Sequence, residues 1–491
     1  MGDIMKKKYR FFGFISILFL CFGLTYKYFQ NDTFYMIKLG DYIYHHGIDF
    51  FDHYCWITKL PYTYPHWLYD LLIYGVYSNF GFYGVYFQTI LFFAFLMFVI
   101  YYVNLKLNHD EFLSIVLSII CVFRLSMFAV ARAQLLSLTC FVLEFYFLYR
   151  LVREGKKKYL CYLFFLCVWV ANIHATVWLF YFILYLPYFG EHIIYLMMRK
   201  KNISFPKLKI EEVSHIRLLT FGFFFSFLLG MLSPSKICYT YFFRIMLGNS
   251  QKFLLEHFPL TVIEHPFFLV SFLILMIILI FTNVRVYLRE LLLIGGLSFM
   301  CLLSTRHLSF YYSIGVIDIG VICVRALKEL GDQTFEILGN FFIHKKYIYF
   351  SCLLLVILFS IFQFCQHGKE EFVLKNEYPV EAVSYIKNNL DDKRIRIYNG
   401  YNYGSYLLFW DIPVFIDSRC DLYLKEFNGM RYSIFDKMAI MPRDYEKEFE
   451  RFGVTHVLVS KKEVLFLILK KDVHYKTLYE DKNFILFEKS I

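Results

Sequence analysis

Eleven long apolar runs, separated by short polar connections, constrain this chain more than any other feature of its sequence. The first, residues 11–29, would extend over about 28 Å as a helix, close to the thickness of a bilayer's hydrocarbon core. The other runs lie at 83–103, 111–127, 133–152, 159–172, 175–198, 217–233, 266–283, 289–304, 308–325 and 347–365. Because 59% of the 491 residues are hydrophobic, one soluble core could not bury this much apolar surface. The pattern predicts an α-helical polytopic membrane protein of eleven spans.

Basic residues between the runs predict the orientation of the chain. Lys6, Lys7, Lys8 and Arg10 precede the first run, which is followed by no small-residue cleavage site and so reads as a retained signal anchor. Alternation of sides then leaves four of the five inside connections basic. We therefore interpret the net charge of +11 as membrane topology and expect no nucleic-acid partner. The N-terminus is expected inside and the tail outside.

The composition divides the chain into two regions. Residues 1–365 are expected to form the transmembrane domain, with a large first outside loop over 30–80 that lies on the membrane. Residues 366–491 have a soluble pattern and predict a small extracytoplasmic α/β domain. The tail is expected to contain helices over 377–390 and 444–452, and strands over 394–398, 414–417, 456–460 and 484–488.

Several catalytic motifs are missing from the sequence. It contains no GxxxxGK[ST], GxGxxG, GxSxG or HExxH pattern, which argues against ATP-driven transport and zinc proteolysis. The twelve cysteines show no CxxC or Cys/His spacing of a zinc site. Cys55 and Cys420 fall in outside segments, and we assign them no disulfide.

Polar residues gather in the connections expected outside. Carboxylates, imidazoles and a guanidinium on one membrane face offer general acid/base groups and an anion clamp. The candidates on this face include Asp32, Asp52, His66, His174, Glu256, His257, Arg306 and His307. An ordinary wet loop is the alternative for any one of them.

Asp32 is the strongest of these candidates, because it follows the first span at once and is held near the lipid headgroups. A second interpretation concerns its neighbour, since Asn31-Asp32-Thr33 is an N-glycosylation sequon. His174 and His307 each stand at a span end, where an interfacial histidine is the alternative to a functional one. Arg306 is suited to a lipid phosphate, with snorkelling to headgroups as the alternative.

Charged residues also occur in or beside the third and fourth spans. Arg124, Arg132 and Glu144 must be paired or face a cavity, because charge in hydrocarbon is costly. For Glu144 we expect a structural pair with an arginine. In the tail, Asn399, Asp417, Arg419 and Asp421 form a polar cluster at strand ends, and we favour an Asp417–Arg419 salt bridge in a turn over a ligand site.

Several short elements together resemble a broad group of bacterial C-type (GT-C) glycosyltransferase-like membrane proteins. They are Asn31 to Gly40, His46-Gly47, Asp52, Pro65 to Leu68, Asn172-Ile173-His174, Pro234, Glu256-His257, Arg306-His307, Tyr398 to Gly400, Gly404 to Leu407 and Ile416 to Arg419. The resemblance covers nearly the whole chain. It departs from the pattern at His66, where the group usually has glutamate, and at Ser418, where it usually has glycine.

The resemblance implies a GT-C fold and a transferase, suspected to be inverting, that moves a sugar from a polyprenyl-phosphate carrier to a glycan, lipid or protein acceptor outside the cytoplasm. Carried over, Asp32 is the candidate base and Asp52 a second acid. Arg306 would take the leaving lipid phosphate, while His66, His174, Glu256 and His307 would contribute to substrate binding. A divalent metal is neither required nor excluded by the sequence.

Two functions therefore remain open at this point. The first is a membrane glycosyltransferase of cell-envelope glycan or glycoconjugate synthesis, in the bacterial plasma membrane with its active face extracytoplasmic. The second is a non-catalytic transport or assembly component whose outside domain binds envelope glycan or a partner protein. Both account for the topology, and only the first accounts for acids, imidazoles and Arg306 on one face.

Overall fold

The computed structural model of the chain describes residues 2–199, 205–247, 257–329, 346–390 and 395–490. It divides into two compact units. The helical unit comprises Met1–Tyr26, Phe87–Tyr239 and Leu254–Lys369, and the loop–tail unit comprises Lys27–Tyr86, Thr240–Phe253 and Glu370–Ile491. The first outside loop, which we had placed with the membrane part of the chain, thus shares a unit with the tail.

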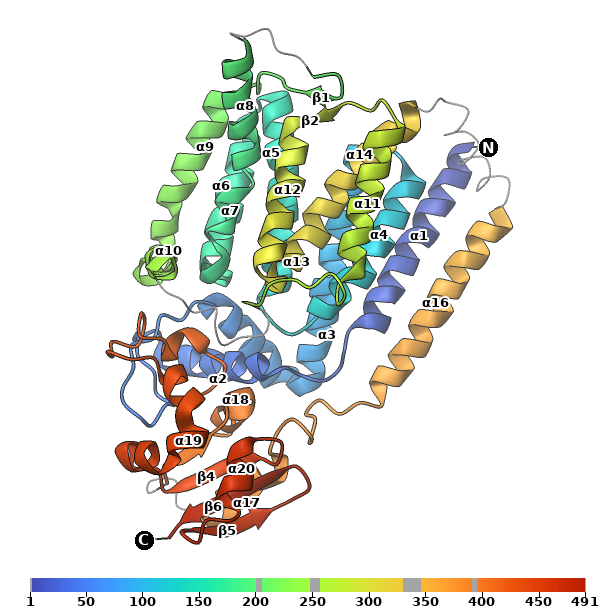
Figure 1. Ribbon diagram of the computed structural model, residues 1–491. Coiled ribbons are helices and arrows are strands. Elements are labelled where there is room, and N and C mark those ends of the chain that lie inside the picture. Colours follow the sequence, from blue (N-terminus) through green and yellow to red (C-terminus); the bar gives the residue numbers. More distant parts are fainter. Residues whose placement is uncertain (1, 200–204, 248–256, 330–345, 391–394, 491) are drawn as a thin grey trace. The chain divides into compact units, whose positions relative to one another are not determined.

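The helical unit is built from apolar helices, most of them long (Figure 1). Their bounds are α1 Gly2–Leu24, α3 Trp67–Asn108, α4 Glu111–Leu125, α5 Gln134–Glu154, α6 Lys158–Ile173, α7 Phe180–Ile183, α8 Leu186–Arg199, α9 Ile216–Leu229, α10 Ile237–Leu247, α11 Pro266–Phe281, α12 Leu288–Leu303, α13 Leu308–Phe310, α14 Val316–Glu329 and α16 Lys346–Gly368. Only the later part of α3 and the first residues of α10 belong to this unit. Each of the eleven predicted runs falls on helix.

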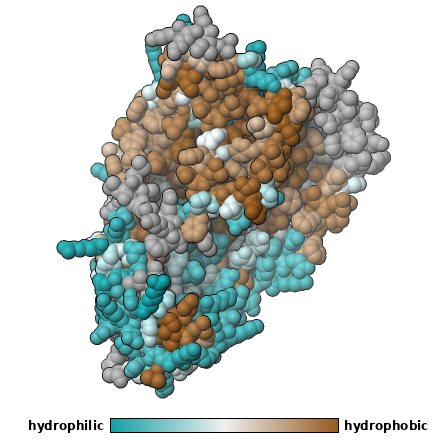
Figure 2. Space-filling view, in the orientation of Figure 1, coloured by the Kyte–Doolittle hydropathy of each residue, from teal (hydrophilic) through white to brown (hydrophobic). Residues whose placement is uncertain are grey.

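Within the described residues, six helices are long and apolar enough to cross a bilayer, and a helix pair broken at Pro234 adds a seventh if it forms one span. Three shorter apolar helices, at Arg10–Leu24, Lys158–Ile173 and Pro266–Phe281, accompany them. Apolar side chains cover much of the visible surface of these helices (Figure 2). The chain is therefore an integral membrane protein, as its composition predicted.

Ion pairs hold the helix ends that we expect inside. Arg289 pairs with the fully buried Glu191 at 2.9 Å, and Arg325 pairs with Glu290. Lys207 donates to the carbonyls of Leu279 and Thr282 at 2.6 and 2.9 Å. These bonds supply donors to backbone carbonyls at the C-terminal end of α11. A short parallel pair, β1 Leu208–Lys209 with β2 Val286–Tyr287, lies beside these contacts.

The expected pairing of Glu144 with an arginine is wrong. Glu144 is fully buried, and neither of its carboxylate oxygens has a hydrogen-bond partner. Arg124 instead stacks on the ring of Phe267, with 4.6 Å between the guanidinium carbon and the ring centroid. An aromatic face satisfies the cation without a carboxylate.

The loop–tail unit begins with helix α2, Asn31–His46, followed by an irregular segment and the first turns of α3. Gly81 interrupts α3 with φ 61° and ψ −156°, a conformation that favours glycine strongly. The break falls two residues before residue 83, where the predicted second span begins. Gly40 of α2 lies so close to α3 that a β-carbon there would stand 2.0 Å from the carbonyl oxygen of Asp70.

The tail contains a four-stranded mixed sheet of order β3-β4-β6-β5. Its strands are β3 Ile397–Asn399, β4 His456–Ser460, β5 Tyr475–Glu480 and β6 Phe484–Lys489, and its helices are α17 Val380–Asn389, α18 Tyr401–Phe409, α19 Ile434–Phe452 and α20 Val464–Leu469. β3 is parallel to β4, whereas β6 is antiparallel to both β4 and β5. The prediction of a small α/β tail, with strands at β3, β4 and β6, is confirmed.

Residues 414–417 do not form the strand that we expected. Val414, Phe415 and Ile416 are all completely buried, as an apolar strand would be. Their backbone, however, pairs with the first loop: Val414 N–H donates to the Tyr54 carbonyl at 2.9 Å and Trp56 N–H to the Val414 carbonyl at 3.1 Å. The apolar pattern was correct, but the pairing partner lies more than 350 residues away in sequence.

Candidate functional site

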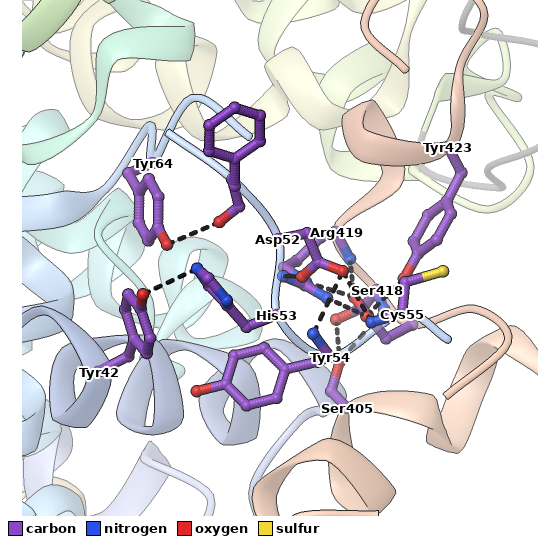
Figure 3. Close-up of polar contacts among 12 residues, drawn as sticks. Tyr42, Asp52, His53, Tyr54, Cys55, Tyr64, Ser405, Ser418, Arg419 and Tyr423 are labelled. Atoms are coloured by element: carbon purple, nitrogen blue, oxygen red, sulfur yellow. Dashed lines mark hydrogen bonds and ion pairs between the residues drawn. The ribbon is translucent and has the colours of Figure 1, made fainter. Parts of the chain in front are cut away.

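A buried ion pair joins the first loop to the tail inside the loop–tail unit (Figure 3). One guanidinium nitrogen of Arg419 donates to Asp52 Oδ1, and both side chains are almost completely inaccessible. The other oxygen of Asp52 accepts from the backbone N–H of Cys55 at 2.7 Å and of Tyr54 at 3.3 Å. Both carboxylate oxygens of Asp52 thus accept hydrogen bonds from the protein.

Arg419 is held on its other side by Asp417. Nε and Nη2 of Arg419 donate to the two oxygens of Asp417 at 2.9 and 2.7 Å, which is a bidentate pair. Burial alone would lower the pKa of Arg419, but Asp417 and Asp52 together raise it well above its usual value. The salt bridge that we favoured between Asp417 and Arg419 is confirmed, and Asp52 completes it as a buried triad, the Asp52–Arg419–Asp417 triad.

The tail residues that carry the family resemblance hold this triad in place. The amide of Asn399 donates to the Ile416 carbonyl at 2.7 Å and accepts from the Phe415 N–H at 2.8 Å. Gly404 lies so near that a β-carbon would stand 1.9 Å from the Ile416 carbonyl oxygen. Ser405 and Ser418 join through their hydroxyls at 2.8 Å. These residues brace the segment that presents Arg419.

Asp32 lies in the first turn of α2 and is partly exposed. The helix N-terminus favours a negative charge at this position. Its neighbour Asn31 is engaged, because the Asn31 amide donates to the backbone carbonyl of Tyr401 at 2.8 Å. α2 and α18 pack together, so Asp32 stands where the first loop meets the tail.

A second polar group of the loop–tail unit surrounds Asp49. Its Oδ2 lies 2.6 Å from His53 Nε2 and accepts from the Tyr42 hydroxyl at 3.1 Å. The ring of Tyr42 stacks with the rings of His46 and His53, with centroids 4.6 and 4.5 Å apart. Although burial acts in the opposite direction, hydrogen bonds from the Phe51 N–H, His53 and Tyr42 lower the pKa of Asp49. His66, a substrate-binding candidate, is half-buried just before α3.

In the helical unit, hydrogen bonds connect two of the predicted site elements. His174, at the end of α6, lies 3.0 Å from the Ser137 hydroxyl through Nδ1. Ser137 is one turn from Gln134, whose amide donates to the Ser309 hydroxyl at 3.2 Å. Ser309 in turn donates to the Arg306 carbonyl at 3.2 Å. The start of α5 therefore ties His174 to the segment of Arg306.

Arg306 and His307 form a short 3-10 turn, Thr305–His307, ahead of α13. Arg306 Nη1 donates to His257 Nε2 at 3.3 Å, so this imidazole nitrogen presents a lone pair. His307 Nδ1 lies 2.8 Å from the Met300 carbonyl, and its ring packs edge-on against Phe180. A π-helical turn, Tyr311–Gly315, follows directly; such turns occur frequently at functional sites.

The predicted site residues thus fall into two groups. Asp32, Asp52 and His66 belong to the loop–tail unit, whereas His174, Arg306 and His307 belong to the helical unit. Glu256 lies outside the described residues. Among those described, no three His, Cys, Asp or Glu side chains are close enough to hold a metal ion.

Sequence reasoning missed Gln134, Ser137 and Ser309, which connect the helical group. A signal was present, because Gln134 and Ser137 are polar residues three apart within an apolar run, on one helix face. The partnership of Asp52 with Arg419 had no such signal, since nothing local relates two residues 367 positions apart.

No family model and no curated protein sequence matches the chain. Solved structures do match. The archaeal oligosaccharyltransferase AglB from Archaeoglobus fulgidus, in complex with an inhibitory peptide and a dolichol-phosphate, has a TM-score of 0.61 at 10% identity, over 99% of this chain and 74% of AglB. ArnT from Cupriavidus metallidurans, bound to undecaprenyl phosphate, has a TM-score of 0.54 at 10% identity, over 96% of each chain.

Both likenesses extend over nearly the full length, at an identity that reflects the fold alone. The GT-C resemblance found from the short sequence elements is therefore confirmed for the architecture. This chain has the GT-C-type membrane fold of AglB and ArnT.

Proposed function

We propose that the chain is a membrane glycosyltransferase that moves a sugar from a polyprenyl-phosphate carrier to an extracytoplasmic acceptor in cell-envelope glycan or glycoconjugate synthesis. The observation that carries the proposal is the full-length fold likeness to two proteins whose structures contain dolichol-phosphate and undecaprenyl phosphate. The fold likeness alone leaves the substrates open. We assign the steps of the reaction to candidate residues of the loop–tail group and of the helical group.

Arg306 is our candidate for binding the carrier phosphate. A guanidinium has five N–H donors, and the contact with His257 uses one of its terminal nitrogens. The remaining donors suit two phosphate oxygens in a fork geometry. The hydrogen-bonded connection through Ser309 and Gln134 to α5 fixes the backbone from which Arg306 projects. His174 and His307 would line the same end of the helical unit.

Asp32 is our candidate for the catalytic base. In an inverting displacement, its carboxylate takes the proton of the acceptor hydroxyl as the acceptor oxygen bonds to the anomeric carbon. The bond from that carbon to the carrier phosphate breaks, and the phosphate leaves as an anion. Asp32 lies in the first turn of α2, where the helix dipole favours a negative charge.

We assign Asp52 a positioning role in place of the acid role carried over from the resemblance. Its carboxylate is completely buried, paired with Arg419 and bonded to two backbone N–H groups. A group with these contacts is a poor proton donor or acceptor for a substrate. It instead fixes the loop that follows α2 against the tail.

We further propose eleven spans, an inside N-terminus and an extracytoplasmic tail, in a bacterial plasma membrane. Basic connections support the orientation, as do the ion-paired helix ends at Arg289 and Arg325. His66 and Glu256 remain candidates for substrate binding on the outer face.

The carrier proposal is tested by lipid binding to the purified full chain. Undecaprenyl phosphate and dolichyl phosphate are expected to raise the melting temperature, whereas undecaprenol, which lacks the phosphate, is expected to leave it unchanged. Arg306→Gln should weaken phosphate-lipid binding about 10-fold or more, because a charge-assisted contact contributes about 1.5–3 kcal/mol.

Lys38→Gln is the matched control, since Lys38 belongs to the loop–tail unit and pairs with Asp411. Equal binding of undecaprenol and its phosphate would contradict the proposal. That result would favour the non-catalytic assembly component as the function of this fold.

A further inference from the structure

The tail presents an apolar surface on helix α20 and on the turn that follows this helix. Val464 and Leu467 of α20 are each 61% exposed, and Val473 in the turn is 88% exposed. Val464 and Leu467 are three residues apart and therefore lie on one face of the helix. Figure 2 shows apolar residues surrounded by hydrophilic ones where Figure 1 places α20. An apolar patch with a polar rim is typical of an interaction site.

Hydrogen bonds and burial hold this α20 surface, made of Val464, Leu467 and Val473, in place. Leu469, near the end of α20, is completely buried. The N–H of Asp472 donates to the Leu469 carbonyl at 3.1 Å, so the turn folds back onto the end of the helix. The carboxylate of Asp472 then accepts from the N–H of His474 at 2.9 Å and from the hydroxyl of Tyr445 at 2.7 Å. Val473 therefore projects from a turn that the protein fixes.

Lysines flank the α20 surface at both ends of the helix. Residues 461–476 contain five lysines and two acidic residues. Glu480 pairs with two of these lysines, Lys461 at 2.7 Å and Lys470 at 3.3 Å. The remaining three are exposed and form no ion pair with any other described residue: Lys462, Lys471 and Lys476. The rim of the surface therefore carries uncompensated positive charge.

This charge distinguishes among the possible occupants of the surface. A second copy of this chain would bring the same lysines face to face, and like charges across an interface repel. Anionic lipid headgroups would meet Glu480 as well as the lysines, and α20 offers them no aromatic anchor, because its Phe466 is only 9% exposed. A protein surface can place acidic side chains opposite the unpaired lysines and leave the ion pairs of Glu480 intact.

We propose that the α20 surface is a docking site for a partner protein that presents an apolar ridge flanked by acidic side chains. Val464, Leu467 and Val473 form the apolar centre, which loses its contact with water when the partner binds. The unpaired lysines at the rim favour a partner of opposite charge. This docking is independent of the proposed transfer reaction.

The proposal is tested by site-specific photo-crosslinking of the full chain in its native membranes, with p-benzoylphenylalanine in place of Leu467. We expect a covalent adduct with another protein. Lys462→Glu combined with Lys471→Glu should reduce the yield of this adduct about 10-fold or more, because attractive rim contacts become repulsive. Lys425→Glu is the matched control, since Lys425 is an exposed lysine of the tail outside this segment, and it should leave the yield unchanged.

A charge exchange then tests the complementarity itself. Mass spectrometry of the adduct identifies the crosslinked protein, and acidic residues on its crosslinked face are changed to lysine. This change should restore crosslinking to the doubly substituted Lys462→Glu and Lys471→Glu chain, and restoration would support the proposal. An adduct of twice the mass of this chain, an adduct with phospholipid only, or a yield that does not respond to these charges would overturn it. So would the absence of any adduct from a chain with an unchanged melting temperature.

Discussion

Arg419 is a buried cation of the loop–tail unit that is paired with two carboxylates. Its guanidinium is 1% exposed and is shared between Asp417 beside it and Asp52 in the first loop. The ring of Tyr62 covers it at 5.2 Å from the guanidinium carbon. A buried ion pair contributes little net free energy, but breaking one leaves uncompensated charge. We therefore expect the Asp52–Arg419–Asp417 triad to favour one pairing of loop and tail.

Replacing Arg419 by methionine is expected to destabilise the loop–tail unit by about 3–5 kcal/mol, since two carboxylates remain buried without a cation. Arg419→Lys should restore only part of this, because lysine cannot form the bidentate fork with Asp417. Thermal unfolding and limited proteolysis of the full chain would measure both effects.

Asp411→Asn is the control for this series. Its ion pair with Lys38 has a carboxylate that is 67% exposed, so its loss should change melting little. If Arg419→Met and Asp411→Asn melted alike, the triad would not hold loop to tail.

For single elements, two glycines of α3 distinguish the effect of backbone strain on stability from the effect of side-chain packing. Gly81→Ala should cost about 1–3 kcal/mol, because φ 61° with ψ −156° is strained for any side chain although no atom lies within 4 Å. Gly75→Ala in the same helix also meets no atom and should be neutral or slightly stabilising. Melting temperatures of the two variants would test this, and equal values would contradict a break at Gly81.

His456 makes the stability of the fold around strand β4 depend on pH. Burial lowers its pKa, while Glu488, its cross-strand neighbour, has a smaller effect that raises the pKa. The unfolded chain, with a histidine pKa near 6.5, then binds a proton more readily than the folded chain. The stability contributed by neutral His456 is complete above about pH 6.5 and is lost as pH falls.

The melting temperature of the wild type should therefore drop between pH 7.5 and 5.5 by more than that of His456→Gln. Parallel melting curves for the two proteins would show that His456 does not titrate differently on unfolding.

The elements themselves could largely be predicted from sequence, because span length and strand patterning are local properties. β4 was predicted with its observed bounds, and each apolar run proved to be helix. Residues 414–417 show where this reasoning fails: their burial was evident, but burial does not specify the pairing partner. Helix α18 was missed because Tyr401 to Phe409 has no clear apolar period and adapts to the packing of α2.

For the whole molecule, the family resemblance predicted the architecture better than it predicted the roles of individual residues. Asn399, Gly404 and Asp417 belong to the tail elements that suggested the family, and the structure gives all three a bracing role. Asp32 lies in the first turn of a helix and Arg306 lies beside His257. These surroundings suit a base and a phosphate contact, respectively. Long-range relations of this kind depend on tertiary pairing, which no single sequence segment encodes.

We propose that Asp32 activates an acceptor for sugar transfer from a polyprenyl-phosphate donor. The decisive measurement is transfer of labelled sugar from reconstituted polyprenyl-phosphate donors to endogenous acceptors by the wild type, Asp32→Asn and the control Asp411→Asn, each verified for insertion and melting. We expect transfer by the wild type and the control, and a loss of kcat of at least about 100-fold in Asp32→Asn with donor binding retained. Full activity of Asp32→Asn, or no transfer from any donor by correctly inserted wild type, would contradict it.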